Sequence, residues 1–321
     1  MSLALSIVIP VYNEEDNIIP LYNKLKHDLT PLQLDYEIIF VDDGSTDTTF
    51  DRIKTLHQTD SSVKGIKFRR NFGKSVALNA AFKKACGDAI ITMDGDLQDD
   101  SGEISHFLEK LEEGYDLVSG WKYPRKDPLT KTLPSKIFNH LTCLLTGVNL
   151  HDFNCGFKAY RKEVAEMICL YGEMHRYTPA LAAWHGFRIG EIKVRHHPRA
   201  AGTSKYGISR LIKGMLDLIT VKYLTTYASR PLHVFGVPGI LSLSLGFVIG
   251  LYLVILKYLK NIELGDRPLL LLSILLIVLG LQFISIGLLG EMSAFRQVRD
   301  ESVDKYIERT LGTAVGPNRA Q

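Results

Sequence analysis

The sequence is poor in cysteine, and the cysteines it has are irregularly spaced. No two of the four form a C-x-x-C pair in the 321 residues. This spacing argues against a zinc site, and a chain of this length does not need a disulfide framework. We therefore expect reduced, mostly buried thiols, since a free cysteine usually packs as a small apolar side chain. The four positions are Cys86, Cys143, Cys155 and Cys169.

Neither sign of charge is in large excess. The chain has 38 basic and 35 acidic residues, so it lacks the strong positive field typical of nucleic-acid-binding proteins. No nucleic-acid partner is expected. The length leaves room for one large domain or for two modest ones.

Two phosphate-binding motifs are also missing. No G-x-G-x-x-G follows the first apolar segment, which disfavours a dinucleotide-binding dehydrogenase. The F-G-K-S sequence at residues 72–75 is not a P-loop, because position 68 is Phe where that motif requires glycine.

Long uncharged stretches occur in the C-terminal third. Residues 234–256 and 269–290 contain no charged side chain, and each is long enough to cross the roughly 30 Å hydrocarbon core of a bilayer as a helix. Buried helices of a soluble core are the alternative, but they seldom stay uncharged on every face over this length. We predict two membrane-spanning helices.

Basic residues around these two stretches indicate the orientation. Residues 210–230 and 296–309 carry four Lys or Arg each, and the connecting residues 257–267 carry three. This excess predicts a multi-pass protein of the inner (cytoplasmic) membrane whose larger part faces the cytoplasm. Apolar residues near one helical face of 206–229 favour a helix lying on the membrane surface, and packing against the domain is the alternative.

Apolar segments suited to strands alternate with segments of helical period near the N-terminus. We expect strands at 5–10, 36–43, 65–70, 88–94 and 115–121, and helices at 14–28, 46–58, 75–86 and 103–113. This alternation predicts an α/β fold, a mostly parallel sheet flanked by helices. The polar loops after the first four strands would then meet at one edge, where such sheets bind ligands.

The fourth of these loops begins with a D-x-D sequence. Asp94 and Asp96 flank a glycine that allows a ligand to approach the backbone. Mg²⁺ or Mn²⁺ typically binds one or two carboxylates, and water and substrate phosphates complete its shell. Acidic turns are common on surfaces, but this one would lie beside Asp42 and Asp43. We interpret it as a metal site that holds a diphosphate.

Several segments together resemble family 2 of the inverting glycosyltransferases, which has the fold called GT-A. These segments are SIVIPVYNEEDNI, VDDGSTDTT, RNFGKSVALNAA and DGDLQDD. The segments HDFNCGFKAYRKEV and RAAGTSKYG and the two apolar stretches resemble one branch of that family, the dolichyl- or polyprenyl-phosphate sugar synthases of mannose or glucose type. The resemblance covers essentially residues 3–295.

The resemblance implies a domain organisation. It places a GT-A domain at 1–205, an amphipathic juxtamembrane helix at 206–230, a two-helix transmembrane anchor at 231–291 and a cytoplasmic tail at 292–321. It also implies a homo-oligomer, although the residues themselves leave monomer, dimer and tetramer open.

The resemblance also implies site residues. Nucleotide-sugar binding maps onto Pro10, Tyr12, Glu14, Asp42, Lys74, Asp94 and Asp152. The metal ligands, for Mg²⁺ or Mn²⁺, map onto Asp94, Asp96 and Gln98. Asp99 and Asp100 are better explained as solvated or helix-capping residues. His175, in GEMHRYTPAL, lies in a segment that the branch often carries, and substrate contact is the less favoured interpretation of it.

The implied reaction moves one hexose from a donor of the GDP-mannose or UDP-glucose type to a polyprenyl or dolichyl phosphate. The attacking phosphate monoester is already an anion, because its second pKa is about 6, so no general base is needed. Cationic groups are needed to offset phosphate repulsion. Catalytic roles are expected for Asp96, Lys122, Arg199 and Lys205. The acceptor phosphate is expected to bind Arg125, Lys131, Ser135, Lys136, Arg199, Ser204 and Lys205.

Two positions depart from the family pattern, and two other functions stay open. Lys122 and Lys131 stand where the family usually has arginine. Lysine keeps the positive charge but cannot make the bidentate hydrogen bond that arginine makes to phosphate. A processive polysaccharide synthase would carry a Q-x-x-R-W motif and more membrane helices. A non-catalytic nucleotide-sugar sensor, or a scaffold of a glycan-export complex, would fit a broken D-x-D better than the intact one here.

Overall fold

The computed structural model describes residues 4–123, 139, 141–197, 209–223, 231–260 and 268–300. The chain divides into two compact units, Met1–Lys222 and Tyr223–Gln321. The finer division at residues 205, 230 and 291 stays a prediction.

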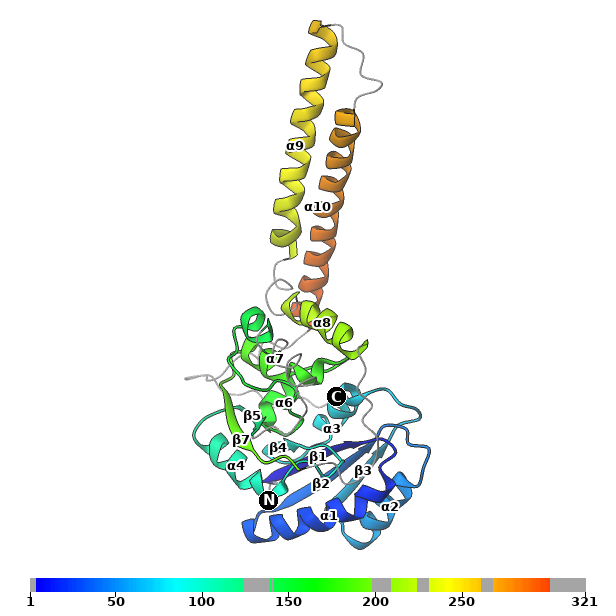
Figure 1. Ribbon diagram of the computed structural model, residues 1–321, viewed down its shortest axis with the longest axis vertical. Coiled ribbons are helices and arrows are strands. Elements are labelled where there is room, and N and C mark those ends of the chain that lie inside the picture. Colours follow the sequence, from blue (N-terminus) through cyan, green and yellow to red (C-terminus); the bar gives the residue numbers. More distant parts are fainter. Residues whose placement is uncertain are drawn as a thin grey trace. The chain divides into compact units, whose positions relative to one another are not determined.

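A mixed sheet forms the centre of the first unit (Figure 1). Its strands are β1 (Leu5–Val11), β2 (Tyr36–Asp42), β3 (Val63–Lys67), β4 (Ala89–Thr92), β5 (Leu117–Lys122), β6 (Lys158–Arg161) and β7 (Ile189–Val194). The order across the sheet is β3-β2-β1-β4-β6-β5-β7. Strand β6 runs antiparallel to both of its neighbours, and the other pairs are parallel. The predicted mostly parallel sheet is confirmed, with a strand at each of the five expected places.

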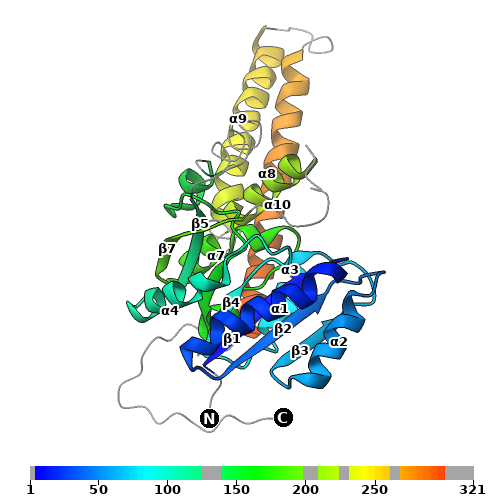
Figure 2. The same ribbon diagram turned by 60° about the horizontal axis from the view of Figure 1, so that its bottom comes forward.

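Helices cover both faces of this sheet, as Figures 1 and 2 show. On one face lie α1 (Glu15–Leu29), α2 (Thr49–Thr59) and α4 (Ile104–Glu112). On the other lie α3 (Lys74–Phe82), α6 (Lys162–Met167) and α7 (Thr178–Trp184). Short 3₁₀ turns, η1 (Thr30–Leu32), η2 (Ser101–Glu103) and η3 (Met174–Arg176), connect them. The arrangement is the sheet flanked by helices on both faces that is expected from the sequence.

An apolar core lies between the sheet and α1, α2 and α4. Alternate residues of β1 point into it, and Leu5, Ile7 and Ile9 are fully buried there. Phe107 of α4 packs against Phe157, with ring centroids 4.5 Å apart. Burying one such side chain stabilises the fold by roughly 1.5–3 kcal/mol. The packing on this face of the sheet therefore stabilises the domain.

All four cysteines are free, but only Cys155 among them is buried. Cys86 lies in the turn before β4 and Cys169 just after α6, and both are exposed. The prediction of mostly buried thiols is therefore wrong, because these two residues fall in connections and not on the inner face of an element.

Helix α8 (Ser209–Lys222) is grouped with the first unit. Leu218 and Val221 are buried, whereas Leu216 and Ile219 are about three-fifths exposed. The helix thus presents apolar residues on a packed face and on an open one. Its position on a membrane surface stays a prediction.

The second unit contains two long apolar helices, α9 (Pro231–Lys260) and α10 (Pro268–Asp300). Both are long and apolar enough to span a membrane, over Pro231–Leu259 and Pro268–Met292. Small residues bring them close together. The Ser273 hydroxyl donates to the carbonyl of Gly246 at 2.8 Å, and a Cβ added to Gly246 would meet the Ser273 carbonyl at the same distance.

Candidate active site

The carboxyl ends of β1, β2 and β4 lie side by side at one edge of the sheet. Val11 at the end of β1 is paired with Asp42 at the end of β2, and Val8 is paired with Thr92 at the end of β4. Pro10 precedes Val11 in β1. The loops that follow these strands contain most of the residues predicted to bind the nucleotide and the metal.

Hydrogen bonds join the loop after β1 to the loop after β2. The Asn13 side chain accepts from the Thr46 N–H at 2.9 Å, and Asn13 has a left-handed φ of 53°. The Glu14 N–H donates to the Thr49 hydroxyl at 3.0 Å. The predicted nucleotide contacts Tyr12 and Glu14 therefore belong to one surface built from both loops.

The two aspartates at the end of β2 have different partners. Asp42 is fully buried and accepts from the Ser45 N–H at 2.8 Å, and Lys67 lies 3.8 Å from its other oxygen. The Asp43 carboxylate accepts from the N–H groups of Phe72 and Gly73, at 2.7 and 2.9 Å. Asp43 thus fixes the loop that leads into α3. A nucleotide contact by Asp42 stays a prediction.

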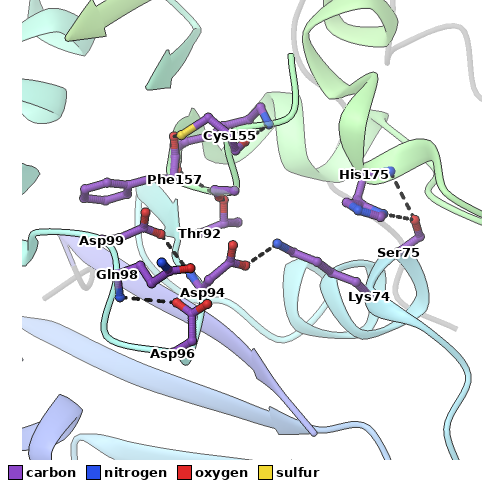
Figure 3. Close-up of polar contacts among 12 residues, drawn as sticks. Lys74, Ser75, Thr92, Asp94, Asp96, Gln98, Asp99, Cys155, Phe157 and His175 are labelled. Carbon is purple, nitrogen blue, oxygen red and sulfur yellow. Dashed lines mark hydrogen bonds and ion pairs between the residues drawn. The ribbon is translucent and has the colours of Figure 1, made fainter. Parts of the chain in front are cut away.

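Lys74, the first residue of α3, makes an ion pair with Asp94 (Figure 3). Burial alone would raise the pKa of Asp94, but the ammonium groups of Lys74 and Lys122 hold it well below its usual range. Burial alone would lower the pKa of Lys74, but the Asp94 carboxylate raises it. Both groups are therefore charged at neutral pH. The predicted nucleotide-sugar residues Lys74 and Asp94 lie together.

Lys122, at the end of β5, lies close enough to the same acidic turn to interact with it electrostatically. Burial would lower its pKa, but the surrounding acidic groups, Cys155, Asp99, Asp94 and Asp152, raise it. This places the ammonium group among the predicted metal-binding and sugar-binding carboxylates. The structure therefore brings Lys122 into the site.

The D-x-D turn presents two carboxylates and an amide. Leu97 has a left-handed φ of 61°, and this reversal turns the chain so that the Gln98 N–H donates to Asp96 at 3.2 Å. The Gln98 amide nitrogen donates to the carbonyl of His197, also at 3.2 Å. Figure 3 shows Asp94, Asp96 and Gln98 on one turn.

These donors fit a divalent cation that takes only part of its shell from the protein. No cluster of three His, Cys, Asp or Glu residues occurs in the part of the chain that the structure describes, so a closed all-protein cage is not found there. Two carboxylates and an amide oxygen suit Mg²⁺ or Mn²⁺, which keeps positions for water and phosphate oxygens. Gly95 allows this turn to pack against Val11, because a Cβ there would meet the Val11 side chain at 2.7 Å.

The next two aspartates are structural. Asp100 accepts from the Gly102 N–H at 3.3 Å, and so caps η2 as predicted, and it pairs with Lys24 at 3.1 Å. Asp99 is 2% exposed and accepts from the Asp94 N–H at 3.2 Å. Asp99 is therefore buried, not solvated, because its carboxylate closes the turn from inside.

Residues 152–157 form a loop over the Lys74–Asp94 pair. The Asp152 carboxylate accepts from the Asn154 N–H at 3.0 Å, and Asp152 is almost fully buried. A Cβ added to Gly156 would meet the Asp94 carboxylate at 2.7 Å. The loop therefore requires glycine at position 156. The sequence alone did not indicate this requirement.

A buried lysine holds this loop. The Lys158 ammonium group donates to the carbonyls of Phe153 and Cys155, and burial lowers its pKa to about 8. Sequence reasoning missed Lys158 as well. The available signal was a lysine inside the otherwise apolar run Phe157–Tyr160, where a charged side chain needs a specific partner.

Several predicted residues lie outside the described part of the chain. They are Arg125, Lys131, Ser135, Lys136, Arg199, Ser204 and Lys205. The acceptor-phosphate site therefore stays a prediction, while the predicted donor and metal residues are placed around one edge of the sheet.

The chain belongs to glycosyltransferase family 2, whose model matches residues 6–169. It is 39% identical over 315 residues to a dodecaprenyl-phosphate galacturonate synthase of Rhizobium johnstonii, covering 97% of this chain and 93% of that one. It is 38% identical over 288 residues to an undecaprenyl-phosphate 4-deoxy-4-formamido-L-arabinose transferase of Shewanella sediminis, covering 89% and 86%.

Solved structures share the fold at lower identity. A glucosyl-3-phosphoglycerate synthase from Mycobacterium tuberculosis, in complex with Mn²⁺, UDP and glucosyl-3-phosphoglycerate, has a TM-score of 0.53 and 17% identity, over 70% of this chain and 80% of that one. A mannosyltransferase from Pyrobaculum calidifontis, in complex with GDP-mannose and Mn²⁺, has a TM-score of 0.50 and 15% identity, over 95% and 78%.

Proposed function

We propose that this protein transfers a single sugar residue from a nucleotide sugar to a polyprenyl phosphate, with inversion at the anomeric carbon. The observation that carries the proposal is the D-x-D turn at the edge of the sheet, where Lys74 pairs with Asp94 and Lys122 lies close enough to act on the same carboxylate. The names of the two relatives, which match nearly the whole chain, support a polyprenyl phosphate as the acceptor.

The charges of the site explain how such a transfer would proceed. A Mg²⁺ or Mn²⁺ ion held by Asp94, Asp96 and Gln98 would neutralise the leaving diphosphate. Lys74 and Lys122 place two ammonium groups at the same turn, where they offset the repulsion between the donor and acceptor phosphates. The acceptor phosphate needs no deprotonation at neutral pH. Arg199 and Lys205 are proposed to hold it.

The sugar is a separate part of the proposal. The resemblance predicts a hexose from a GDP-mannose or UDP-glucose type of donor, whereas the relatives are named for galacturonate and for 4-deoxy-4-formamido-L-arabinose. Galacturonate is a hexose oxidised at C6. 4-Deoxy-4-formamido-L-arabinose is a five-carbon sugar, but the galacturonate relative matches more of the chain, so we propose a six-carbon pyranose, either neutral or oxidised at C6.

The proposed location is the cytoplasmic face of the inner membrane, with α9 and α10 spanning the bilayer. Both helices are long and apolar enough for this role, and such a location would bring the head group of a lipid acceptor to a soluble donor. The basic residues that flank both helices support the orientation.

The test is an incubation of the purified protein with polyprenyl phosphate, Mg²⁺ or Mn²⁺ and radiolabelled nucleotide sugars. The donor panel is UDP-glucose, UDP-galacturonate, GDP-mannose and UDP-4-deoxy-4-formamido-L-arabinose. Label is counted in the organic phase, with a chelator and Asp96→Asn as controls. Transfer from one donor that both controls abolish supports the reaction and identifies the sugar, and transfer from the arabinose donor alone would overturn the six-carbon part of the proposal.

Two other outcomes would overturn the proposal. Donor binding without a lipid product from any member of the panel would favour the sensor or scaffold. A product that grows by many sugar residues would favour a processive polysaccharide synthase.

A further inference from the structure

His175 is joined to the first turn of α3 by two contacts with one hydroxyl group. Its backbone N–H donates to the Ser75 hydroxyl oxygen at 3.1 Å, and its ring Nδ1 lies 3.0 Å from the same oxygen. Ser75 is fully buried and follows Lys74 directly. The imidazole ring of His175 therefore lies beside the Lys74–Asp94 ion pair (Figure 3).

These contacts determine which ring nitrogen carries the proton. The Ser75 oxygen already accepts the backbone N–H, and a hydroxyl group has one hydrogen to donate. No other acceptor for that hydrogen occurs among the described residues, so it is donated to Nδ1 of His175. Nδ1 is then unprotonated, and Nε2 carries the hydrogen.

The ring is also kept neutral. Burial holds the pKa of His175 well below its usual range, and the cations of Lys74, Arg176 and Lys158 act in the same direction, against the opposing effect of Asp94. An imidazole in this state is a neutral donor at Nε2 throughout the physiological pH range.

The Nε2–H group has no hydrogen-bond partner in the part of the chain that the structure describes. His175 is only partly buried, so this donor is open to solvent and can bind water or a ligand. We propose that His175 donates this hydrogen bond to a hydroxyl oxygen of the sugar in the nucleotide-sugar donor, and that Ser75 positions the ring for it. This inference rests on the proposed function.

A hydroxyl oxygen fits better than a phosphate oxygen for two reasons. Phosphate charge at this turn already has cationic partners in Lys74 and Lys122. A neutral imidazole adds no charge, but its fixed N–H direction distinguishes one hydroxyl position from another, and such buried polar contacts dominate discrimination between similar substrates.

The test compares three variants by calorimetric titration of the whole protein with a nucleotide sugar and with its nucleoside diphosphate. His175→Asn places its amide near Nδ1 and lacks the distal donor. His175→Gln places an N–H near Nε2. Ser75→Ala keeps the imidazole but removes the group that selects its tautomer. The probes are UDP-glucose, UDP-galacturonate and GDP-mannose, each matched with UDP or GDP.

The expected result is a selective loss of affinity for the sugar. His175→Asn weakens binding of the best nucleotide sugar by roughly tenfold and leaves binding of the diphosphate unchanged. His175→Gln recovers most of that loss, and Ser75→Ala shows a smaller loss in the same direction. Thermal unfolding of each variant confirms that it is folded.

Three results would overturn the inference. An equal loss for the nucleotide sugar and the diphosphate indicates a purely structural role for His175. Unchanged affinities exclude the contact, and the absence of binding by every nucleotide sugar in the panel excludes it for the proposed six-carbon donors. Because titration needs no turnover, normal selective binding without lipid product would reject only the proposed transfer reaction.

Discussion

Replacing Gly156 by alanine tests how closely the 152–157 loop has to approach Asp94. The added Cβ would lie 2.7 Å from an oxygen of Asp94 and 2.8 Å from the Lys74 ammonium nitrogen, whereas ordinary contact begins at 3.4 Å. The ion pair would have to move by about 0.7 Å to make room. Gly156 does not have a positive φ, so the backbone itself accepts alanine.

The size of the effect follows from this displacement. Misplacing a reacting or binding group by about 1 Å costs on the order of 100-fold in rate, so we expect kcat/KM to fall by roughly 10- to 100-fold. Both crowded atoms are ends of flexible side chains, and the melting temperature should therefore change little. The assay is the initial rate of sugar transfer into lipid, with thermal unfolding measured alongside.

Gly102→Ala is the matched control. It lies next to the same acidic turn, but its added Cβ would meet only the Asp100 carboxylate, at an ordinary 3.6 Å. This variant should keep wild-type activity. Wild-type kcat/KM in Gly156→Ala would refute the reasoning. It would show either that the loop moves away to make room for the methyl group or that the reaction rate does not depend on the position of Asp94.

Three further predictions follow from other parts of the molecule. Asp96→Asn should reduce transfer at least about 100-fold and remove the Mn²⁺ dependence of donor binding, and metal-dependent binding of normal strength would contradict the metal site. Burial lowers the pKa of Lys158 to about 8, while the unfolded lysine stays protonated to about pH 10. The free energy of unfolding should therefore rise between pH 8 and 10 in the wild type relative to Lys158→Met, and an equal difference at pH 7 and 9.5 would contradict this. Phe107→Ala should lower that free energy by about 3–5 kcal/mol, measured by denaturant unfolding, and a cost below about 1 kcal/mol would show that the core collapses around the gap.

The first half of the sheet could be predicted because its strands are unmistakable. Segments such as Ile38–Val41 are continuous apolar runs, and helical periods separate them. Strand β6 could not be predicted in this way. It has four residues, Lys158–Arg161, with a charge at each end, and its partners are β4 and β5 from earlier in the chain. Pairing over such a distance leaves no local pattern.

The same distinction applies to the site. The D-x-D turn is local, so its place at the end of a strand could be read from the sequence, and the structure places Lys74 and Lys122 beside it. Gly156 packs against Asp94, which lies 62 positions earlier in the chain. Ser75 and His175 are 100 positions apart. Only the folded chain brings them together.

The two hydrogen bonds between Gln98 and His197 have a consequence for mutational scanning. The His197 N–H donates to the Gln98 carbonyl at 2.8 Å, and the His197 carbonyl accepts from the Gln98 side chain. On the His197 side both bonds use only the backbone, and the proline at position 198 favours the extended conformation that they need. An alanine scan would therefore leave this link intact and would report only the loss of the contact between the His197 ring and Asp100, at 3.4 Å. Proline at position 197 removes the N–H, and an ester in place of that amide would do so without changing any side chain.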